Sequence, residues 1–490
     1  MANGSASLTH FENWFAERNW TPFAFQADVW QAMIEGQSGL LYAPTGMGKT
    51  LAVWLGALSR MEIVSPSPTL QVIWITPLRA LAGDTREALK EPIAYFRPEC
   101  SVEVRTGDTT SHAKKKQEEQ PPHALITTPE SLTLLLTRPK AENHMAGLKV
   151  VIVDEWHELL GSKRGVQTEL ALARLRTMVP ELIIWGLSAT LGNLDEALAH
   201  LLGFKIDGTA RKGRVISGRI PKELHIDSLL PESTARFPWA GHLGLKMLPK
   251  VVDELEPVSS ALVFTNTRSQ CELWHQALSE ARPDWRIGLH HGSLANEERR
   301  VTEQGLKTGE YKVVVCTSSL DLGVDFSPVE RVLQIGSPKG VARLLQRAGR
   351  SGHGPGRVSR VTCVPAHVFE LVEAAAARDA TQAGAVESRP PYNCPLDVLA
   401  QHAVSMGLGK GFRKKELLRE IRTTASYKDV SDTEWDWLLE FLSTGGATLS
   451  AYPEYHKLQV KNEIYKVSDP AKAQRHRMSI GTIVSDAAIQ

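Results

Sequence analysis

The chain has 490 residues, with 56 Lys and Arg against 55 Asp and Glu, and 42% of its residues are hydrophobic. This length predicts about three domains, and the balanced charge means that nucleic-acid binding would need a local basic surface. Five scattered cysteines without a C-x-x-C pair argue against a zinc or cluster site. Without a leader or an apolar run of roughly 18 residues, the chain is expected to be cytoplasmic, with no membrane partner.

Short apolar runs alternate with amphipathic stretches, which is typical of parallel strands buried on both faces. In the first half the predicted strands are LLYAP (40–44), QVIWITP (71–77), ALITTP (124–129), VVIVDE (150–155) and LIIWGLSAT (182–190). In the second half they are ALVFTN (261–266), IGLHHG (287–292), KVVVCTS (312–318) and RVLQIG (331–336). We therefore predict two α/β domains in tandem, over residues 1–220 and 221–390.

Two segments fall outside this alternating pattern. Residues 204–245 carry Gly, Pro and basic residues without sustained periodicity, so the crossover between the domains is placed there. Segment 112–122, HAKKKQEEQPP, mixes basic and acidic residues with prolines. We interpret it as a solvated loop rather than a binding patch.

The pattern changes after Pro390. Helical periodicity is found near 395–407, 414–424 and 432–443, the last begun by a capping box of Ser431 and Glu434. Two short strands then flank Asn462. Three helices and a hairpin predict a winged-helix domain over 391–470, and a small helical packing domain without a ligand is the alternative.

The segment APTGMGKT, residues 43–50, follows a predicted strand and begins a helix, as a phosphate loop does. Its backbone amides can surround a triphosphate, Lys49 can reach the β and γ phosphates, and the Thr50 hydroxyl can bind Mg²⁺. Ala43 stands where the general pattern has Gly. The sequence thus predicts an ATP and Mg²⁺ site, with the loop completed by Thr45, Gly46 and Gly48.

Two carboxylates end the predicted strand VVIVDE (150–155), in VIVDEWHELLG (151–161). Asp154 is expected to hold the Mg²⁺, and Glu155 to orient or deprotonate the water that attacks the γ phosphate. His157 either couples this site to the neighbouring domain or is a solvated or capping histidine.

The phosphate loop, the D-E-x-H sequence and Ser188-Ala189-Thr190 together resemble a superfamily 2 helicase of the DExH type. This resemblance implies two RecA-like domains with the nucleotide between them. Longer strings are similar to the Lhr (large helicase-related) group, especially its bacterial branch of ligase-associated DExH helicases. They are VIVDEWHELLGSKRGVQTELALARLR (151–176), QRAGRSGH (346–353) and PLDVLAQH (395–402). The Lhr resemblance implies a 3′-to-5′ single-stranded DNA translocase with a winged helix and a further β-barrel domain.

The last residues resemble the start of that β-barrel. The string RHRMSIGTIVSDAAIQ (475–490) carries this resemblance, so we place the start of the barrel at 471–490. Because the string then stops, an amino-terminal fragment or a shortened member is expected.

The resemblance implies that the second domain supplies arginines that complete the nucleotide site. Arg347 and Arg350 are three apart on a predicted helix, so both can touch a transferring phosphoryl group, with ordinary surface ion pairs as the alternative. By the resemblance, Asp325 lies near the nucleotide, and Thr317 and Ser319 lie near the nucleic acid.

Gln26, in TPFAFQ, resembles the glutamine that reads the adenine edge. The nearby Trp20, Phe23 and Phe25 could stack on the base, but core packing is the preferred interpretation.

Three further segments at strand exits place hydroxyls and helix starts where they can hold phosphates. Their positions match the family's strand-binding motifs, and the expected contacts are Thr76, Arg79, Thr128, Thr265 and Arg268. A track along one backbone predicts little sequence specificity and a strong salt dependence.

The leading functional expectation is an ATP-driven DNA helicase or translocase that serves repair and acts on single strands and tailed duplexes. An RNA or RNA:DNA-hybrid helicase is an alternative, because the same backbone track serves either polymer. An ATP-gated clamp that binds without moving is a third. A link to a DNA ligase or nuclease is implied only by the name of the branch.

Overall fold

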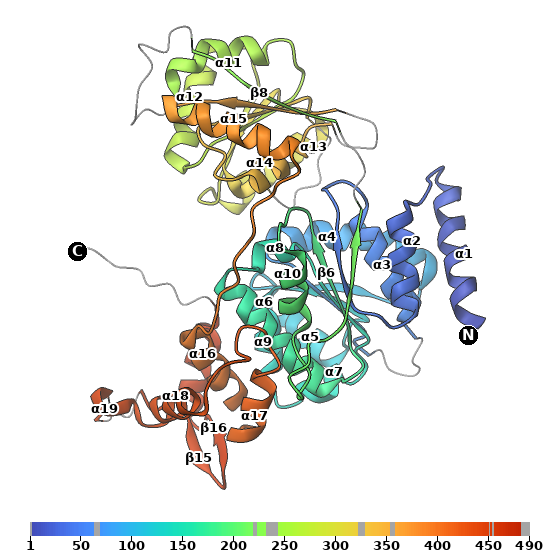
Figure 1. The fold of residues 1–490 in the computed structure, drawn as a ribbon, viewed down its shortest axis with the longest axis vertical. Coiled ribbons are helices and arrows are strands. Elements are labelled where there is room, and N and C mark those ends of the chain that lie inside the picture. The colour runs from blue at the N-terminus through green and yellow to red at the C-terminus, as the bar shows by residue number, and fades with distance from the viewer. Residues whose placement is uncertain are drawn as a thin grey trace.

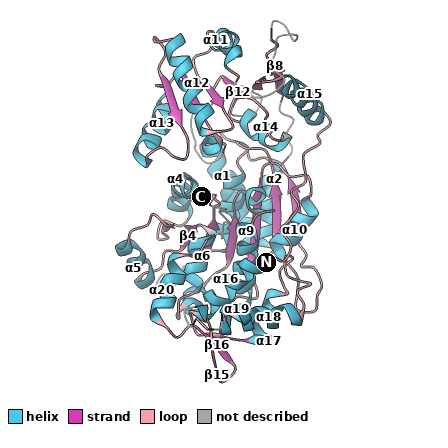
Figure 2. Ribbon diagram, turned by 90° about the vertical axis from the view of Figure 1, so that its left-hand side faces the viewer, coloured by secondary structure: helices cyan, strands magenta, loops and turns pink. Residues whose placement is uncertain are grey.

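The computed structural model describes residues 2–62, 69–218, 223–231, 244–321, 329–352, 358–449, 451–452 and 455–481. Two parallel-sheet α/β domains lie one above the other, and a winged-helix domain lies below the first (Figure 1). The view turned by 90° shows the same order (Figure 2). The predicted fold class is confirmed.

Within the described residues, the first domain contains a seven-stranded parallel sheet of order β3-β4-β2-β5-β6-β1-β7. Five of the strands fall on the predicted apolar runs, and β3 and β7 are additional. The strands are β1 (Gly39–Tyr42), β2 (Val72–Ile75), β3 (Val102–Arg105), β4 (Ala124–Thr127), β5 (Val150–Val153), β6 (Ile183–Ser188) and β7 (Arg214–Ser217). The helices are α1 (Ala2–Glu17), α2 (Ala24–Ile34), α3 (Lys49–Arg60), α4 (Arg79–Phe96), α5 (Ser111–Glu119), α6 (Pro129–Leu136), α7 (Ala141–Met145), α8 (Trp156–Leu159), α9 (Lys163–Met178) and α10 (Leu194–Leu202).

The second domain, over the part of it that the structure describes, has a six-stranded parallel sheet of order β10-β11-β9-β12-β13-β8. Its strands are β8 (Leu224–Ser228), β9 (Ala261–Phe264), β10 (Ile287–His290), β11 (Val313–Cys316), β12 (Arg331–Ile335) and β13 (Ser359–Val364). Its helices are α11 (Leu248–Leu255), α12 (Arg268–Ala281), α13 (Asn296–Thr308), α14 (Val341–Ala348) and α15 (Val368–Gln382), with 3-10 turns η2 (Leu245–Met247) and η3 (Ser318–Leu320). The chain passes from the first sheet to the second between β7 and β8.

Alternate residues of each central strand enter separate hydrophobic cores, because successive side chains of a strand point to opposite faces. In β2, Ile73 and Ile75 join one core, while Val72 and Trp74 join the other. All four side chains are buried. The second sheet is covered in the same way, which explains why these strands are apolar runs rather than alternating ones.

The prediction of a loop at 112–122 is wrong for most of this segment, since α5 occupies Ser111–Glu119. The Thr110 side chain accepts a hydrogen bond from the Ala113 amide and caps the helix. Lys, Gln and Glu are strong helix formers, and Glu118 pairs with Arg105 of β3 at 2.8 Å. A charged segment can therefore be a surface helix tied to the sheet edge.

The winged-helix domain contains the three predicted helices and the predicted hairpin. The capping box of Ser431 and Glu434 is present, and Asn462 and Glu463 have positive φ in the hairpin turn. Its helices are α16 (Leu396–Gly407), α17 (Lys414–Ile421), α18 (Asp432–Thr444), α19 (Gly446–Leu449) and α20 (Pro470–Met478). Its strands β14 (Phe412–Arg413), β15 (Gln459–Lys461) and β16 (Ile464–Lys466) form an antiparallel sheet of order β14-β16-β15.

Part of the segment expected to begin a β-barrel is helical. Helix α20 lies against α16, and His476 Nε2 is 2.9 Å from the Ser405 hydroxyl. The Gln401 side chain donates to the Gly481 carbonyl at 2.9 Å. Residues 482–490 lie outside the described part of the chain, so the barrel stays a prediction.

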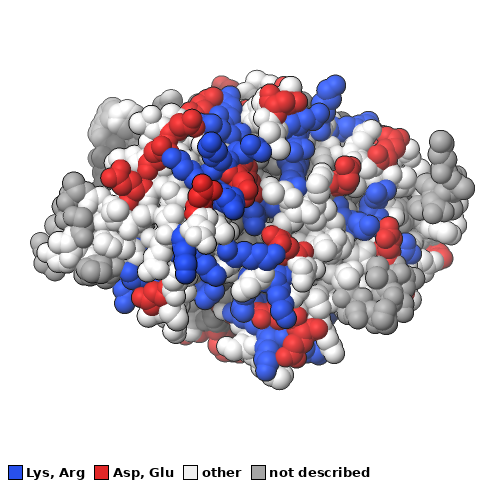
Figure 3. Space-filling view, turned by 90° about the horizontal axis from the view of Figure 1, so that it is seen from below, with Lys and Arg blue, Asp and Glu red and all other residues white. Residues whose placement is uncertain are grey.

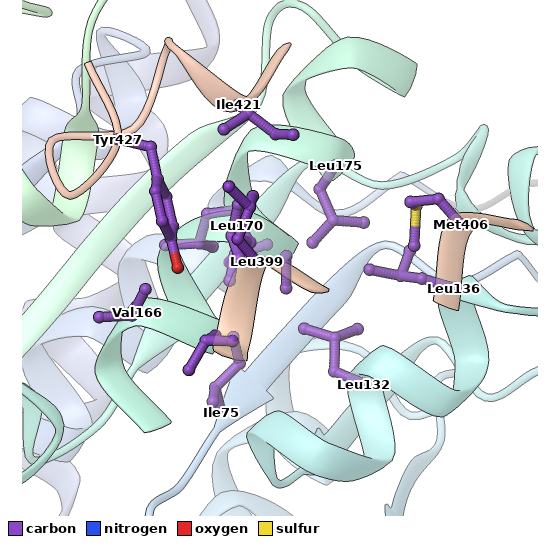
Figure 4. Packing of buried hydrophobic residues seen from close by; sticks show 14 of the residues in the cluster. Ile75, Leu132, Leu136, Val166, Leu170, Leu175, Leu399, Met406, Ile421 and Tyr427 are labelled. Atoms are coloured by element: carbon purple, nitrogen blue, oxygen red, sulfur yellow. The ribbon is translucent and has the colours of Figure 1, made fainter. Parts of the chain in front are cut away.

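The winged-helix domain shares a hydrophobic core with the first domain. Leu399, Met406, Ile421 and Tyr427 belong to the same buried cluster as side chains of β2, α6 and α9 (Figure 4). The polar edge of this contact is also paired, since the Glu169 carboxylate accepts from the amide and the hydroxyl of Ser426 at 3.0 and 2.9 Å. The two domains therefore form one packed unit.

The outer face of the winged-helix end carries both signs of charge (Figure 3). Several cations of the winged-helix domain are paired with acids: Lys410 with Glu142, Arg413 with Glu463, and Arg422 with Asp432. This face is thus not a uniform basic surface. Separately, no described helix is both long and apolar enough to cross a membrane.

His402 makes the stability of this packed unit sensitive to acid. Burial, and to a lesser extent the Arg174 charge, lowers the pKa of His402 to about 3. The unfolded chain takes up a proton below about pH 6.5, whereas the folded chain does not, so stability falls as the pH falls from about 6.5 toward 3. At pH 5 the loss is about 2 kcal/mol.

Urea unfolding at pH 7 and pH 5 tests this prediction. His402→Gln should reduce the loss of stability between the two pH values by about 2 kcal/mol. His112→Gln is the matched control, because this histidine is exposed on α5, and it should leave the pH dependence as in the wild type. An unchanged pH dependence in the His402 variant would contradict the prediction.

Candidate nucleotide site and nucleic-acid track

The phosphate loop connects β1 to α3 at the carboxyl end of the first sheet. Gly46 and Gly48 have φ of 81° and 77°, in the left-handed region that favours glycine. The Lys49 ammonium donates to the carbonyls of Ala43 and Pro44 at 2.8 and 3.1 Å, which leaves it a third N–H. Burial lowers the pKa of Lys49, against the opposing charges of Glu155 and Asp154.

Asp154 and Glu155 follow β5, next to the loop. The Asp154 carboxylate accepts from the Trp74 indole at 3.3 Å and from the Glu155 amide at 2.9 Å. Burial raises the pKa of Asp154, and burial together with the Asp154 charge raises that of Glu155 to about 7. The buried Oε2 of Glu155 has no hydrogen-bond partner among the described residues, so it is available to a water molecule or a ligand.

These groups line a cavity of about 380 Å³, to which both motor domains contribute residues. It is lined by Thr45, Gly46, Gly48, Lys49, Thr50, Leu81, Asp84, Thr85, Ala88, Asp154, Glu155, Leu187 and Arg350. Arg350 belongs to the second domain, where its Nη2 donates to the Asp321 carbonyl at 3.0 Å. Its charge lowers the pKa of both Lys49 and Glu155, as a secondary cause in each case.

Arg347 lies elsewhere. The prediction that both arginines share a face of one helix is wrong, because α14 ends at Ala348 and Arg350 follows it. The Arg347 guanidinium donates to both Asp321 carboxylate oxygens, at 2.7 and 3.2 Å, and also to Gln334. It is 1% exposed, so in this structure it braces the second domain and does not line the cavity.

Arg347→Ala is therefore expected to destabilise the chain by about 3–5 kcal/mol, because it leaves the buried Asp321 carboxylate without both of its hydrogen bonds from Arg347. Arg343→Ala is the control, since Arg343 is partly exposed and lies 3.6 Å from the same carboxylate. The control should cost about 1 kcal/mol or less. Urea unfolding measures the free energy of unfolding of both variants. Equal losses would show that the buried Arg347–Asp321 pair contributes no more than the partly exposed Arg343.

His157 contacts the second domain. Its Nε2 is 2.5 Å from the Gln346 side-chain amide, and its Nδ1 lies 3.6 Å from Glu155 Oε2. Burial, with the charges of Arg389 and Lys49, lowers the pKa of His157 well below its usual value. A neutral, fully buried imidazole thus connects the Glu155 loop to α14, as its coupling interpretation expects, and the solvated alternative is wrong.

Gln26 is buried beside the phosphate loop. Its Oε1 accepts from the Phe23 amide at 2.9 Å, and its Nε2 donates to the Gly48 carbonyl at 3.1 Å. Gln26 does not line the cavity, so its adenine-reading role stays a prediction. Asp325, the other residue expected near the nucleotide, lies outside the described residues.

The seven residues of the expected nucleic-acid track divide by exposure. The hydroxyl-bearing Thr76, Thr128 and Thr265 are buried, and their hydroxyls bond within the protein. Thr128 caps α6, where its oxygen accepts from the Ser131 amide. In this structure these three residues shape the strand exits, and their hydroxyls are not offered to solvent.

The remaining four residues lie nearer the surface. Arg79 is exposed and pairs with Asp108 at 3.0 Å, and exposed Arg268 bonds the Ser293 hydroxyl. Thr317 and Ser319 are half-buried, and Ser319 Oγ lies 2.7 Å from His290 Nδ1. The two arginines are thus the members of the track that can exchange an exposed partner for a phosphate.

The residues at the cavity fit a magnesium ion. Mg²⁺ in nucleotide sites is held by one or two protein oxygens together with phosphates and waters. The Asp154 carboxylate and the Thr50 side chain both line the cavity. No cluster of three or more His, Cys, Asp or Glu that could hold a metal by itself lies among the described residues.

Three residues outside the cavity lining make contacts that the sequence did not reveal. Gln346 contacts His157, the Asp321 carboxylate accepts from Arg347, and the Asp321 main-chain carbonyl accepts from Arg350. Asn193 of the first domain binds the segment after α15. Gln346 begins the quoted string QRAGRSGH, so that string offered a signal, whereas Asp321 and Asn193 offered none.

Three family models match the chain in succession. They describe a DEAD/DEAH box helicase (residues 23–197), a helicase conserved C-terminal domain (244–354) and the winged helix domain of large helicase-related protein (379–490). The chain is 35% identical to ATP-dependent helicase Lhr-Core protein 2 of Thermococcus barophilus, over 93% of this chain and 55% of that protein. It is 33% identical to Lhr helicase/uracil glycosylase of Escherichia coli, over 88% of this chain and 32% of that protein.

A solved structure agrees with these matches. The helicase Lhr of Mycobacterium smegmatis, bound to ssDNA and AMP-PNP, superposes with a TM-score of 0.83 at 30% identity, over 99% of this chain and 62% of that one. The chain spans about half the length of the archaeal Lhr-Core relatives that it matches. The ordered matches, the two parallel sheets and the winged helix together show that the chain belongs to the large helicase-related (Lhr) family of helicases.

Proposed function

We propose that the chain is an ATP-dependent motor that moves 3′ to 5′ along single-stranded DNA and unwinds tailed duplexes in DNA repair. The observation that carries the proposal is the cavity in which Lys49, Asp154 and Glu155 of the first domain meet Arg350 of the second. Such a site is completed only when the two domains approach each other. Nucleotide binding and domain closure are therefore linked.

Each residue has a distinct task in this proposal. The amides of the phosphate loop and Lys49 bind the phosphates. Thr50 and Asp154 would hold Mg²⁺, which would supply charge neutralisation for the phosphates. Glu155 Oε2 orients the attacking water and accepts its proton. Arg350 donates to the transferring phosphoryl group and, being in the second domain, couples hydrolysis to domain movement.

The strand and the direction rest on the family. The M. smegmatis relative is bound to ssDNA, and the exposed Arg79 and Arg268 follow strand exits of the two motor domains. Backbone contacts of this kind do not distinguish DNA from RNA by sequence, so RNA:DNA hybrids are included among the proposed substrates. A functional link to a DNA ligase or nuclease also belongs to the proposal and rests only on the resemblance to the ligase-associated branch.

The test is ATP-dependent strand displacement on matched duplexes that carry 3′ or 5′ tails of DNA or RNA. Lys49→Ala is the inactive control, because it removes the phosphate-binding ammonium. Displacement confined to 3′ DNA tails is the expected result. A preference for RNA tails would favour an RNA helicase, and tight strand binding with negligible ATP turnover would favour an ATP-gated clamp.

A further inference from the structure

Residues 386–391, within the connection from α15 to α16, cross the boundary between the motor domains. We call this segment the strap. It descends from the second domain beside the first and leads to the winged helix, as the orange trace shows (Figure 1). The strap forms neither helix nor strand. Its polar groups nevertheless bind both motor domains, Glu387 the second domain and Arg389 the first.

On the second-domain side, Glu387 caps α14. Its carboxylate accepts from the amides of Val341 and Ala342, the latter at 2.9 Å. Gly340 precedes them with φ of 128°, and a Cβ there would lie 3.0 Å from Glu387 Oε1. Although partial burial opposes the charge, these amides lower the pKa of Glu387. A carboxylate at a helix N-terminus is favoured by the unpaired amides and the helix dipole.

On the first-domain side, Arg389 is held by its backbone and its side chain. The Asn193 amide group accepts from the Arg389 N–H at 3.0 Å and donates to the Arg389 carbonyl at 3.1 Å. The Arg389 guanidinium donates to Glu158 Oε1 at 3.2 Å. Glu158 lies three residues after Glu155, on α8.

Two glycines of the first domain allow the strap backbone to approach. A Cβ on Gly161 would lie 2.7 Å from the Pro390 carbonyl oxygen, and one on Gly192 would lie 2.4 Å from that of Val386. Gly161 ends the α8 segment that follows Glu155, and Gly192 follows Ser188-Ala189-Thr190. The strap therefore lies against both loops that border the catalytic carboxylates.

The helix that Glu387 caps is the one that reaches the nucleotide site. Gln346, near the end of α14, contacts His157, and Arg350 follows the helix into the cavity. Glu387 and Arg389 are two residues apart, so the strap has little slack between its two attachments. Movement of α14 relative to the first domain must therefore strain or break the attachment at Glu387 or the one at Arg389.

We propose that Glu387 and Arg389 are positioning residues for ATP hydrolysis, which set the approach of α14 and Arg350 to the catalytic carboxylates by tying α14 to the first domain. This inference rests on the proposed function. Neither residue touches the nucleotide cavity. Glu387 binds α14, and Arg389 holds the strap to the first domain. The strap thereby makes the connection to the winged helix part of the motor rather than a passive linker.

A double-mutant cycle on strand-stimulated ATP hydrolysis tests the inference. Glu387→Ala removes the attachment to α14, and Asn193→Ala removes the two hydrogen bonds that hold the Arg389 backbone to the first domain. Each should lower kcat by about fivefold with KM for ATP nearly unchanged, which corresponds to the loss of one helix-terminal interaction. Because either change loosens the strap, the double variant should be about as active as the single ones.

A fall in kcat of about 25-fold in the double variant would overturn the inference. Independent structural losses add in free energy, so their effects on kcat multiply. Glu387→Gln retains an acceptor for the α14 amides and should restore part of kcat. Glu434→Ala is the matched control, because Glu434 also caps a helix, α18, far from the cavity. It should leave kcat unchanged.

A measurement that needs no activity separates this inference from the proposed function. Hydrogen exchange at the Val341 and Ala342 amides should become about tenfold faster in Asn193→Ala, whose altered side chain contacts neither amide. Unchanged exchange would overturn the strap inference, even if the wild type is an active ATPase. A wild type without strand-stimulated hydrolysis would instead refute the proposed function, while faster exchange would still support the strap.

Discussion

Glu155→Gln is expected to lower strand-stimulated ATP hydrolysis by about 10²- to 10⁴-fold while ATP binding is retained. Glutamine keeps the shape of the side chain but cannot accept the proton of the attacking water. The phosphate loop and Asp154 are untouched, so the binding of a fluorescent ATP analogue should remain near that of the wild type. Because burial and Asp154 already raise the pKa of Glu155, the neutral side chain should also raise the thermal midpoint of the nucleotide-free protein.

Asp84→Asn provides the comparison for this variant. Asp84 lines the same cavity but pairs with Lys307 at 3.3 Å and does not follow β5. Asp84→Asn should lower ATP hydrolysis by about tenfold or less, which is much less than the effect of Glu155→Gln. Near-normal hydrolysis by Glu155→Gln would mean that another group prepares the water.

Arg350→Ala is expected to lower kcat by about 10³-fold or more, the range found when an arginine that stabilises the transferring phosphoryl group is removed. Strand binding without nucleotide should change little, because Arg350 faces the nucleotide cavity. Stopped-flow ATP hydrolysis and fluorescence anisotropy with a labelled single strand measure the two quantities separately. Arg350→Lys should recover only part of the activity, since a single ammonium cannot reproduce the planar fork of guanidinium donors.

Arg347→Ala is the informative partner of this variant, because the two arginines are three residues apart but differ in surroundings. Arg347 should chiefly affect stability, and Arg350 chiefly turnover. If Arg350→Ala loses strand binding and turnover equally, Arg350 has a structural role and the site must be completed by another cation.

The fold was largely predictable because the central strands are buried on both faces. Runs such as VVIV at 150–153 and VVVC at 313–316 have few alternative interpretations. The edge strand β3 was missed because its sequence, VEVR, is short and half charged, and β7, GRVISG with its neighbours, is isolated among Gly and basic residues. Helix α5 was not predicted because its mixed charges and the following prolines indicate a solvated loop, whereas its Lys, Gln and Glu residues favour a helix.

The site was predictable only where chemistry depends on local spacing. The phosphate loop, Asp154 and Glu155 are set by consecutive residues around two strand ends, and the structure brings them into one cavity. The different placements of Arg347 and Arg350 depend on Asp321, 26 residues before the first of them, and no periodicity shows that distant carboxylate. The same holds for Asn193, whose partner Arg389 is 196 residues away.

The core shared by the first domain and the winged helix has a consequence for synthesis of the chain. Leu132, Val166 and Leu170 pack against Leu399 and Tyr427, which leave the ribosome more than two hundred residues later. A nascent first domain must therefore wait, with part of its apolar surface uncovered, until the second domain has been made. Among the described residues, the cores of the second domain contain only its own side chains. The second domain can therefore finish folding earlier, so the order of completion differs from the order of translation.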